Sequence, residues 1–332
     1  MPSTSLRTRF IRWATSAAIA GTLVGALVGA IAALPARAAA QMFAQRVMIP
    51  VPLDDSTRPR GLLPGFSYLA DVQRGWRSAG DDRAWDARLS GTIEVWRASP
   101  RTTIVIGTAD ELVANSLKDG GFNPRGIGWE LSAGVAHRVG GVTVQLDFAH
   151  DCRHAVDDVD PPGPAYYIPG YVPTQRTLSV NGPRLRVVSP WMRAGSRVRA
   201  RGAVGGTWYL GQWDGRQTQN EPDQPHPVDS WGQARGSATA DVRIEATVVR
   251  GSAVFVRGAT SGIFFAHAPD APVTARARAS HRLELGWRVP GRAGSVEVYG
   301  AAEHLFDDVA SIVPRTSNVV GVGLRLAERN QF

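Results

Sequence analysis

The stretch that decides the fold is ARARASHRLELGWRV, residues 275–289. Its side chains alternate between two kinds along the whole segment. The odd positions hold apolar residues and one histidine, and most even positions hold a charged residue. Successive side chains of a β-strand point to opposite faces, so the segment predicts a strand with one apolar face and one charged face.

The same period of two recurs along the chain, whereas no later segment approaches the roughly 18 uninterrupted apolar residues of a membrane helix. We therefore predict about twelve amphipathic strands. They lie near residues 68–78, 86–97, 102–108, 126–138, 142–153, 177–191, 196–210, 232–250, 252–267, 274–290, 294–305 and 318–327.

The connections between these strands alternate in length. Every second connection is a short turn, such as Gly140-Gly141, and the longer ones include 109–125, 154–176, 211–231 and 306–317. Membrane barrels have short periplasmic turns, longer external loops and an even strand number. The sequence thus predicts an all-β fold, an antiparallel up-and-down transmembrane β-barrel of about 12 strands.

A soluble β-sandwich or lipocalin-like barrel is the alternative fold, because its strands also alternate. Two features favour the membrane barrel. Many strands reach the 9–11 residues needed to cross a bilayer at a tilt, and tryptophans fall near strand ends, where an interfacial belt belongs. We assign Trp129 and Trp208 to the external side of this belt and Trp191 and Trp287 to the periplasmic side.

The first forty residues predict the compartment. Arg7, Arg9 and Arg12 precede an apolar run over 14–34 and a small-residue stretch over 36–40, the order of a secretory signal peptide. We predict a signal peptide at 1–40, a periplasmic lead-in at 41–65 and the barrel at 66–332. We therefore expect secretion across the inner membrane and insertion into the bacterial outer membrane by the barrel-assembly machinery.

The composition limits the classes of binding partner that we expect. The formal charge of +8 includes four arginines of the predicted signal peptide, and acids interleave with the remaining basic residues, so we expect no nucleic-acid partner. We expect outer-membrane lipid and lipopolysaccharide as partners and no metal or other cofactor, and we leave the oligomeric state open. Cys152 is the single cysteine, which excludes an intrachain disulfide.

The charged faces predict the content of the lumen. Arginines that alternate with outward apolar residues point inward, together with acids such as Glu284 and Glu297. Such a lumen is either a network of ion pairs or a narrow, anion-biased pore. The predicted lumen arginines are Arg276, Arg278, Arg282, Arg288 and Arg325.

One cluster of residues with reactive side chains lies over 148–158, at the external end of the fifth predicted strand. His150 and Cys152 are two residues apart and share the lipid-facing side, where they could act as base and nucleophile. The non-catalytic interpretation is a rim cluster that binds lipopolysaccharide phosphates or divalent ions, or that pairs internally. Its binding residues are Arg153, His154, Asp157 and Asp158.

Three segments, 69–71, 110–112 and 150–158, resemble an uncharacterised family of proteobacterial outer-membrane β-barrel proteins. That family carries a His-x-Ser-Ser-His-x-x-Asp-acid stretch at the corresponding strand end, and the resemblance covers roughly residues 65–160. Its His-x-Ser core is similar to outer-membrane phospholipase A, a twelve-stranded barrel with an outward Ser-His-Asn triad that needs calcium and dimerisation.

The resemblance implies His150 as the base and places Cys152 at the serine position. We assign Asn181 to the lumen-facing side of the next strand and Asp157 to the loop, which leaves no third member. The primary prediction is an outer-membrane barrel without catalysis, structural or a narrow pore. The alternatives are a lipid-facing acyl hydrolase, which would need calcium, and an adhesion or ligand-binding protein that works through loops 154–176 and 211–231.

Overall fold

The computed structural model describes residues 59–76, 84–116, 122–155, 173–218, 226–227, 234–249, 251–266, 277–292, 294–305 and 317–328. The predicted signal peptide at 1–40 lies outside these residues, and so do Asp157, Asp158 and Arg276. Within the described part of the chain, no helix is long and apolar enough to cross a membrane.

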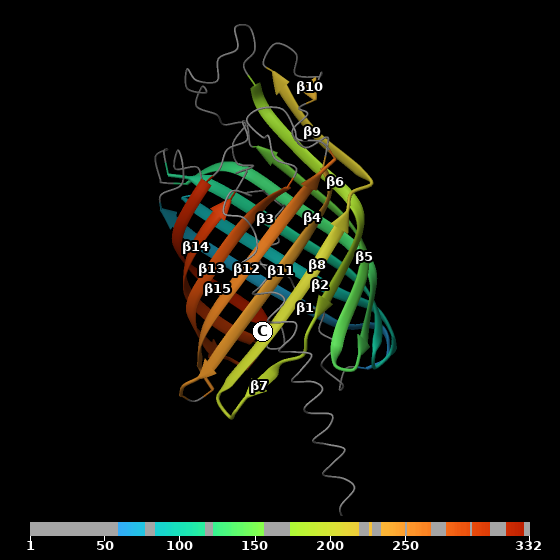
Figure 1. Cartoon of the computed structure of the whole chain (residues 1–332), viewed down its shortest axis with the longest axis vertical. Coiled ribbons are helices and arrows are strands. Elements are labelled where there is room, and N and C mark those ends of the chain that lie inside the picture. Colours follow the sequence, from blue (N-terminus) through green and yellow to red (C-terminus); the bar gives the residue numbers. More distant parts are fainter. Residues whose placement is uncertain are drawn as a thin grey trace, which may run out of the picture. The chain divides into compact units, whose positions relative to one another are not determined.

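Twelve strand positions form one closed antiparallel ring (Figure 1). The ring closes because β1 pairs with β15 from Leu69↔Ala327 to Trp76↔Val320. This confirms the predicted barrel. The strands are β1 (Gly61–Trp76), β2 (Trp85–Ser99), β3 (Thr102–Asn115), β4 (Asn123–Val139), β5 (Val142–Ala155), β6 (Pro173–Val188), β8 (Val198–Trp208), β11 (Ala234–Thr247), β12 (Ala253–Phe265), β13 (Ala277–Pro290), β14 (Gly294–Leu305) and β15 (Ser317–Glu328).

Three short strands complete the sheet. β9 (Gly211–Thr218) continues the position of β8, since β8 pairs with β6 over 184–188 and β9 pairs with β6 over 173–181. β10 (His226–Pro227) pairs with β9, and β7 (Met192–Ala194) pairs with β8. These pieces explain why fifteen strands make only twelve positions in the ring.

The two faces of β13 follow the predicted alternation. On β13, Leu283 and Leu285 are 57% and 61% exposed, whereas Arg282 and Glu284 are buried inside the ring. An apolar outer surface suits a hydrocarbon solvent, and a closed ring leaves no unpaired strand edge in it. The chain is therefore a transmembrane β-barrel whose interior holds charged residues such as Arg282 and Glu284.

Ion pairs organise the interior of the barrel. Arg325 is fully buried and lies 2.9 Å from Asp71, 2.8 Å from Glu284 and 3.1 Å from Glu297. Glu297 also pairs with Arg243 at 2.6 Å. The network thus joins β1, β11, β13, β14 and β15 through side chains.

The predicted position of Trp191 in a periplasmic interfacial belt is wrong. It packs against buried Leu69 and Ala327, and the guanidinium of Arg199 lies 4.0 Å from its ring centroid. β6 ends at Val188, so Trp191 belongs to the connection to β7 and turns toward the interior. It is therefore a packing residue there and not part of an interfacial belt, whereas Trp208 and Trp287 are exposed.

Candidate functional site

The outward face of β5 changes character along the strand. Leu146 and Phe148 are exposed apolar residues, but the next three outward side chains are His150, Cys152 and His154. Because residues two apart share a face, the same parity that places the apolar residues in lipid places these polar ones on the outer surface. The polar segment lies in the half of β5 that leads to the 156–172 connection.

The neighbouring strand β6 presents a matching polar column. The register pairs Asn181 with His150, Ser179 with Cys152 and Thr177 with His154. We call these six residues the outer polar patch. It spans two adjacent strands on the lipid-facing side of the wall.

Asn181 does not face the lumen as its sequence pattern predicts. Its amide forms a hydrogen bond with outward His150, and the register with β5 runs without interruption from Thr177 to Val188. Leu178 and Val180 are buried on the inner side instead. The apolar-outward rule therefore inverts in this half of β6, and applying that rule assigns Asn181 to the wrong face.

Two hydrogen-bonded chains run through the outer polar patch. The Nδ1 of His150 lies 2.6 Å from Oδ1 of Asn181. The Sγ of Cys152 lies 3.1 Å from Nε2 of His154, whose Nδ1 lies 3.0 Å from the hydroxyl of Thr177. The ring of Trp129 stacks on His154 with centroids 4.7 Å apart, so the His154 ring is held by a hydroxyl and an indole.

This geometry is that of a nucleophile, a base and an orienting group. The distance from Cys152 to His154 falls within the hydrogen-bond reach expected of such a pair, and Thr177 fixes the other ring nitrogen. Cys152 is thus hydrogen-bonded to His154 and to the side chain of Ser179, while His150 is bonded to Asn181. Both histidines stand two residues from Cys152, so sequence spacing alone cannot choose between them.

Arg153, another residue of the predicted rim cluster, points into the barrel. Arg153 lies on the inner side, where it forms an ion pair with Glu111 and stands 3.9 Å from Asp151. The predicted cluster is therefore divided by the wall of the barrel: the two histidines and Cys152 lie outside and Arg153 inside. The structure describes neither Asp157 nor Asp158.

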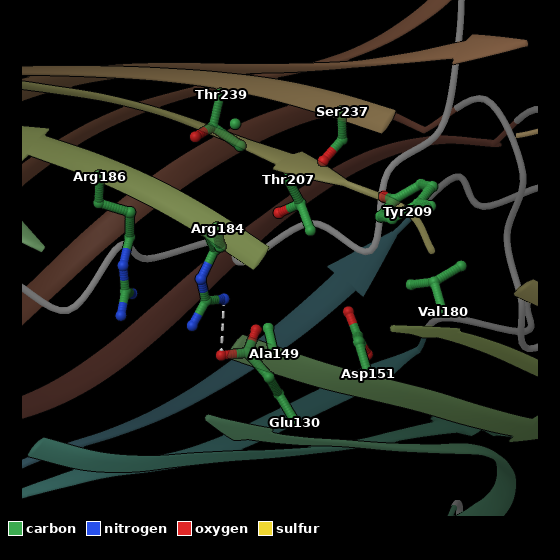
Figure 2. A pocket seen from close by; sticks show the side chains of 11 residues that line it. Glu130, Ala149, Asp151, Val180, Arg184, Arg186, Thr207, Tyr209, Ser237 and Thr239 are labelled. Atoms are coloured by element: carbon green, nitrogen blue, oxygen red, sulfur yellow. Dashed lines mark ion pairs between the residues drawn. The ribbon is translucent and has the colours of Figure 1, made fainter. Parts of the chain in front are cut away.

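A cavity lies behind the outer polar patch, on the inner side of the same strands (Figure 2). Arg184 crosses it to pair with Glu130 at 2.8 Å, and it also pairs with Asp147 at 2.8 Å. Asp151 and Tyr209 line the same space. Because the side chains of Asp151 and Cys152 point to opposite faces, this cavity is separate from the thiol.

Three of the five predicted lumen arginines form ion pairs with acids. Arg282 pairs with Glu303 at 3.1 Å, Arg288 with Glu245 at 3.3 Å and Arg325 with three carboxylates. Arg278, near the start of β13, is partly buried. Among the described residues, no group of three or more His, Cys, Asp or Glu side chains is placed to hold a metal ion.

These features define a class, the outer-membrane type of β-barrel. No family model and no curated protein matches the chain. Three solved structures similar to it are barrels of this class, and their likeness concerns the fold alone.

The outer-membrane phospholipase dimer of Salmonella typhi, with bound calcium, has 12% identity and a TM-score of 0.45, covering 84% of this chain and 98% of that one. The translocator domain of the autotransporter NalP from Neisseria meningitidis has 13% identity and a TM-score of 0.40, covering 96% and 98%. The toluene transporter of Ralstonia pickettii has 11% identity and a TM-score of 0.36, covering 84% and 92%.

Proposed function

We propose that this barrel acts from its outer surface as an acyl hydrolase of membrane lipid esters, with Cys152 as the nucleophile. One observation carries the proposal: the thiol of Cys152, Nε2 of His154 and the hydroxyl of Thr177 form one hydrogen-bonded chain on the lipid-facing side. A polar cluster in that position is costly unless its groups satisfy one another. Acyl transfer requires a nucleophile beside a base, and lipid esters are the substrates that meet this face.

The reaction proceeds in two steps. His154 takes the proton of the Cys152 thiol, and the sulfur attacks the ester carbonyl carbon. The carbon–oxygen ester bond breaks, the alcohol leaves with the proton from His154, and a thioester remains. Water then attacks the thioester with His154 as base, which releases the fatty acid and restores the thiol.

The remaining members of the outer polar patch have supporting roles. Thr177 orients the imidazole of His154, and Ser179, the register partner of Cys152, supplies a hydroxyl donor for the developing oxyanion. Oδ1 of Asn181 accepts a hydrogen bond from Nδ1 of His150 in the tautomer that leaves Nε2 of that ring unprotonated. Cys152 is 7% exposed, so a lipid ester has to seat directly against the strand surface.

The test is hydrolysis of a phospholipid in mixed micelles by the refolded protein, with and without calcium. We expect Cys152→Ala to abolish fatty-acid release and His154→Ala to reduce it by about 10²–10⁴-fold. Thr177→Val should cause a smaller loss, because the hydroxyl only orients the ring.

A matched control exists at the other end of the barrel. Thr102 and His137 form a similar outward pair, with Oγ1 and Nδ1 2.8 Å apart, and no cysteine is their register partner. His137→Ala should leave hydrolysis unchanged. Wild-type protein without hydrolase activity in either condition, or activity that survives Cys152→Ala, refutes the proposal.

The second candidate is a structural barrel, and the ion-paired interior favours it over a narrow pore. Glu94 on β2, Glu297 on β14 and Arg325 on β15 are each fully buried. An anion-selective pore needs arginines that are free to meet ions. If the hydrolase test fails and planar bilayers show no ion current, the structural role is the one that remains.

Both candidates place the protein in the outer membrane. We propose that it reaches this membrane by secretion across the inner membrane and insertion by the barrel-assembly machinery, and that it contacts lipid and lipopolysaccharide there. Membrane fractionation and a heat-modifiable gel shift test this placement. Recovery of the protein from the soluble periplasmic fraction contradicts it.

A further inference from the structure

A second polar group lies on the outer surface, across four consecutive strands far from the outer polar patch in sequence. It consists of Thr260 on β12, His281 on β13, His304 on β14 and Asn318 on β15, and we call it the histidine belt. The register pairs each member with the next one: Thr260↔His281, His281↔His304 and His304↔Asn318. The four side chains therefore form one row around the barrel.

Thr260 and Asn318, at the two ends of the row, contact the two imidazole rings. The hydroxyl of Thr260 lies 3.3 Å from the carbonyl oxygen of Ser280, to which it donates, and 2.9 Å from Nδ1 of His281, from which it accepts. The amide oxygen of Asn318 lies 2.7 Å from Nδ1 of His304 and can only accept. With the hydroxyl proton of Thr260 donated to Ser280, both contacts are satisfied by the ring tautomer that carries its proton on Nδ1.

This tautomer leaves a lone pair on each Nε2. Histidines that bind metals donate their other ring N–H to a neighbouring oxygen in the same way, which fixes the ring and raises its basicity. The histidine belt supplies such an oxygen partner to both rings. Thr260 and Asn318 therefore occupy the positions of second-shell partners for a metal bound by the two histidines.

The spacing of the two histidines also suits a shared ion. His281 and His304 are directly opposite on neighbouring antiparallel strands, where Cβ atoms lie about 4.5–5.5 Å apart. A tetrahedral Zn²⁺ with Zn–N distances of about 2.0–2.1 Å needs its two nitrogens roughly 3.3 Å apart. Two imidazoles that extend from such a pair can converge to that distance.

We propose that His281 and His304 bind one divalent transition-metal ion through their Nε2 atoms. Imidazole ligands suit Zn²⁺, Cu²⁺ and Ni²⁺. With only two protein ligands, the ion keeps open positions for water or for a phosphate oxygen of an outer-leaflet lipid. The site is independent of the proposed hydrolase, because it shares no residue with the outer polar patch.

The test is titration of Zn²⁺ alone into untagged, refolded Cys152→Ala protein, followed by calorimetry. The Cys152→Ala background removes the neighbouring thiol of His154 as a competing ligand. We expect one ion per barrel. His281→Ala or His304→Ala should weaken binding by more than about 100-fold, since losing a ligand costs more than losing a second-shell partner. Asn318→Ala should weaken it by about 10-fold.

The control is His137→Ala, which removes an outward histidine with a threonine partner but no second histidine opposite it, and should leave Zn²⁺ binding unchanged. Cu²⁺ loaded at the same site should show two nitrogen ligands by electron paramagnetic resonance. Each variant is checked by the heat-modifiable gel shift, and His281→Gln replaces a variant that fails it.

Three results overturn the proposal. The first is Cys152→Ala protein that binds no Zn²⁺. The second is Zn²⁺ binding that survives both histidine substitutions. The third is inorganic phosphate that binds without metal and is lost in the same variants, which would make the histidine belt an anion site.

Discussion

At the scale of single residues, Arg325 holds the interior together through its charge. It is fully buried, it contacts Asp71, Glu284 and Glu297, and its guanidinium lies 4.4 Å from the ring centroid of Tyr299. Glu284 and Glu297 are almost fully buried, and Asp71 is 7% exposed. A buried acid without a cationic partner is strongly unfavourable. Arg325 therefore stabilises the three acids together with Arg243, which pairs with Glu297, and with Arg257 and Arg282, which pair with Glu284.

We expect Arg325→Met to destabilise the barrel by about 3–5 kcal/mol, because it removes the charge and leaves the three carboxylates behind. Urea unfolding of the refolded protein in micelles measures the change. Arg197→Met is the control, since Arg197 is exposed near the β7–β8 turn and should shift stability by less than about 0.5 kcal/mol. Equal stability of the two variants would contradict the role given to Arg325.

The site residues show what single positions reveal without a structure. His150, Cys152 and His154 could be placed together because spacing by two on one strand fixes a shared face. Thr177 and Asn181 could not, because their contact with β5 depends on the cross-strand register. A threonine and an asparagine carry no sequence mark that distinguishes a partner of histidine from an ordinary strand residue.

At the scale of elements, all twelve predicted strands exist, but their ends were predicted less well than their centres. β3 extends to Asn115, whereas the alternation in sequence predicts a strand only as far as residue 108. Asp110 occupies an outward, exposed position, and a charge there ends the apolar pattern without ending the hydrogen bonds to β4. Apolar periodicity therefore reports where a strand meets lipid and not where its pairing stops.

Close packing between strands leads to a second prediction, at Gly286 of β13. A Cβ at this position would lie 2.6 Å from the ring of Phe255 and 2.6 Å from Cβ of Tyr299, both buried in the interior. We expect Gly286→Ala to cost about 1–3 kcal/mol in unfolding free energy, because the two aromatic residues have to move.

The matched substitution for this prediction is Gly258→Ala on the adjacent strand β12. A Cβ at Gly258 would meet nothing within 4 Å, so its stability should change by no more than about 0.5 kcal/mol. Urea midpoints of the two variants give the comparison. A loss at Gly258 as large as that at Gly286 would show that backbone effects outweigh the contact.

At the scale of the whole molecule, the ring and its charges depend on one another. Twelve strands give a barrel between filled eight-stranded barrels and open sixteen-stranded porins, so side chains can occupy much of the interior. Inward charges on separate strands, such as Glu94 on β2, Asp147 on β5 and Glu297 on β14, are all buried. The alternation in sequence predicts that these charges face inward, but only the closed ring determines which ones meet.

This filling predicts that the wild-type barrel carries no steady ion current in a planar bilayer. The variant Arg243→Ala with Glu297→Ala should introduce one, because it removes the volume of a buried ion pair while leaving the net charge unchanged. Arg325 keeps Asp71 and Glu284, and Glu245 keeps Arg199, so the change is mainly one of space. The control is the double variant Leu283→Ala with Val298→Ala, which changes two exposed outward residues and should carry no ion current. Current through the wild-type protein at the level of the double variant would mean that the ion pairs do not close the lumen.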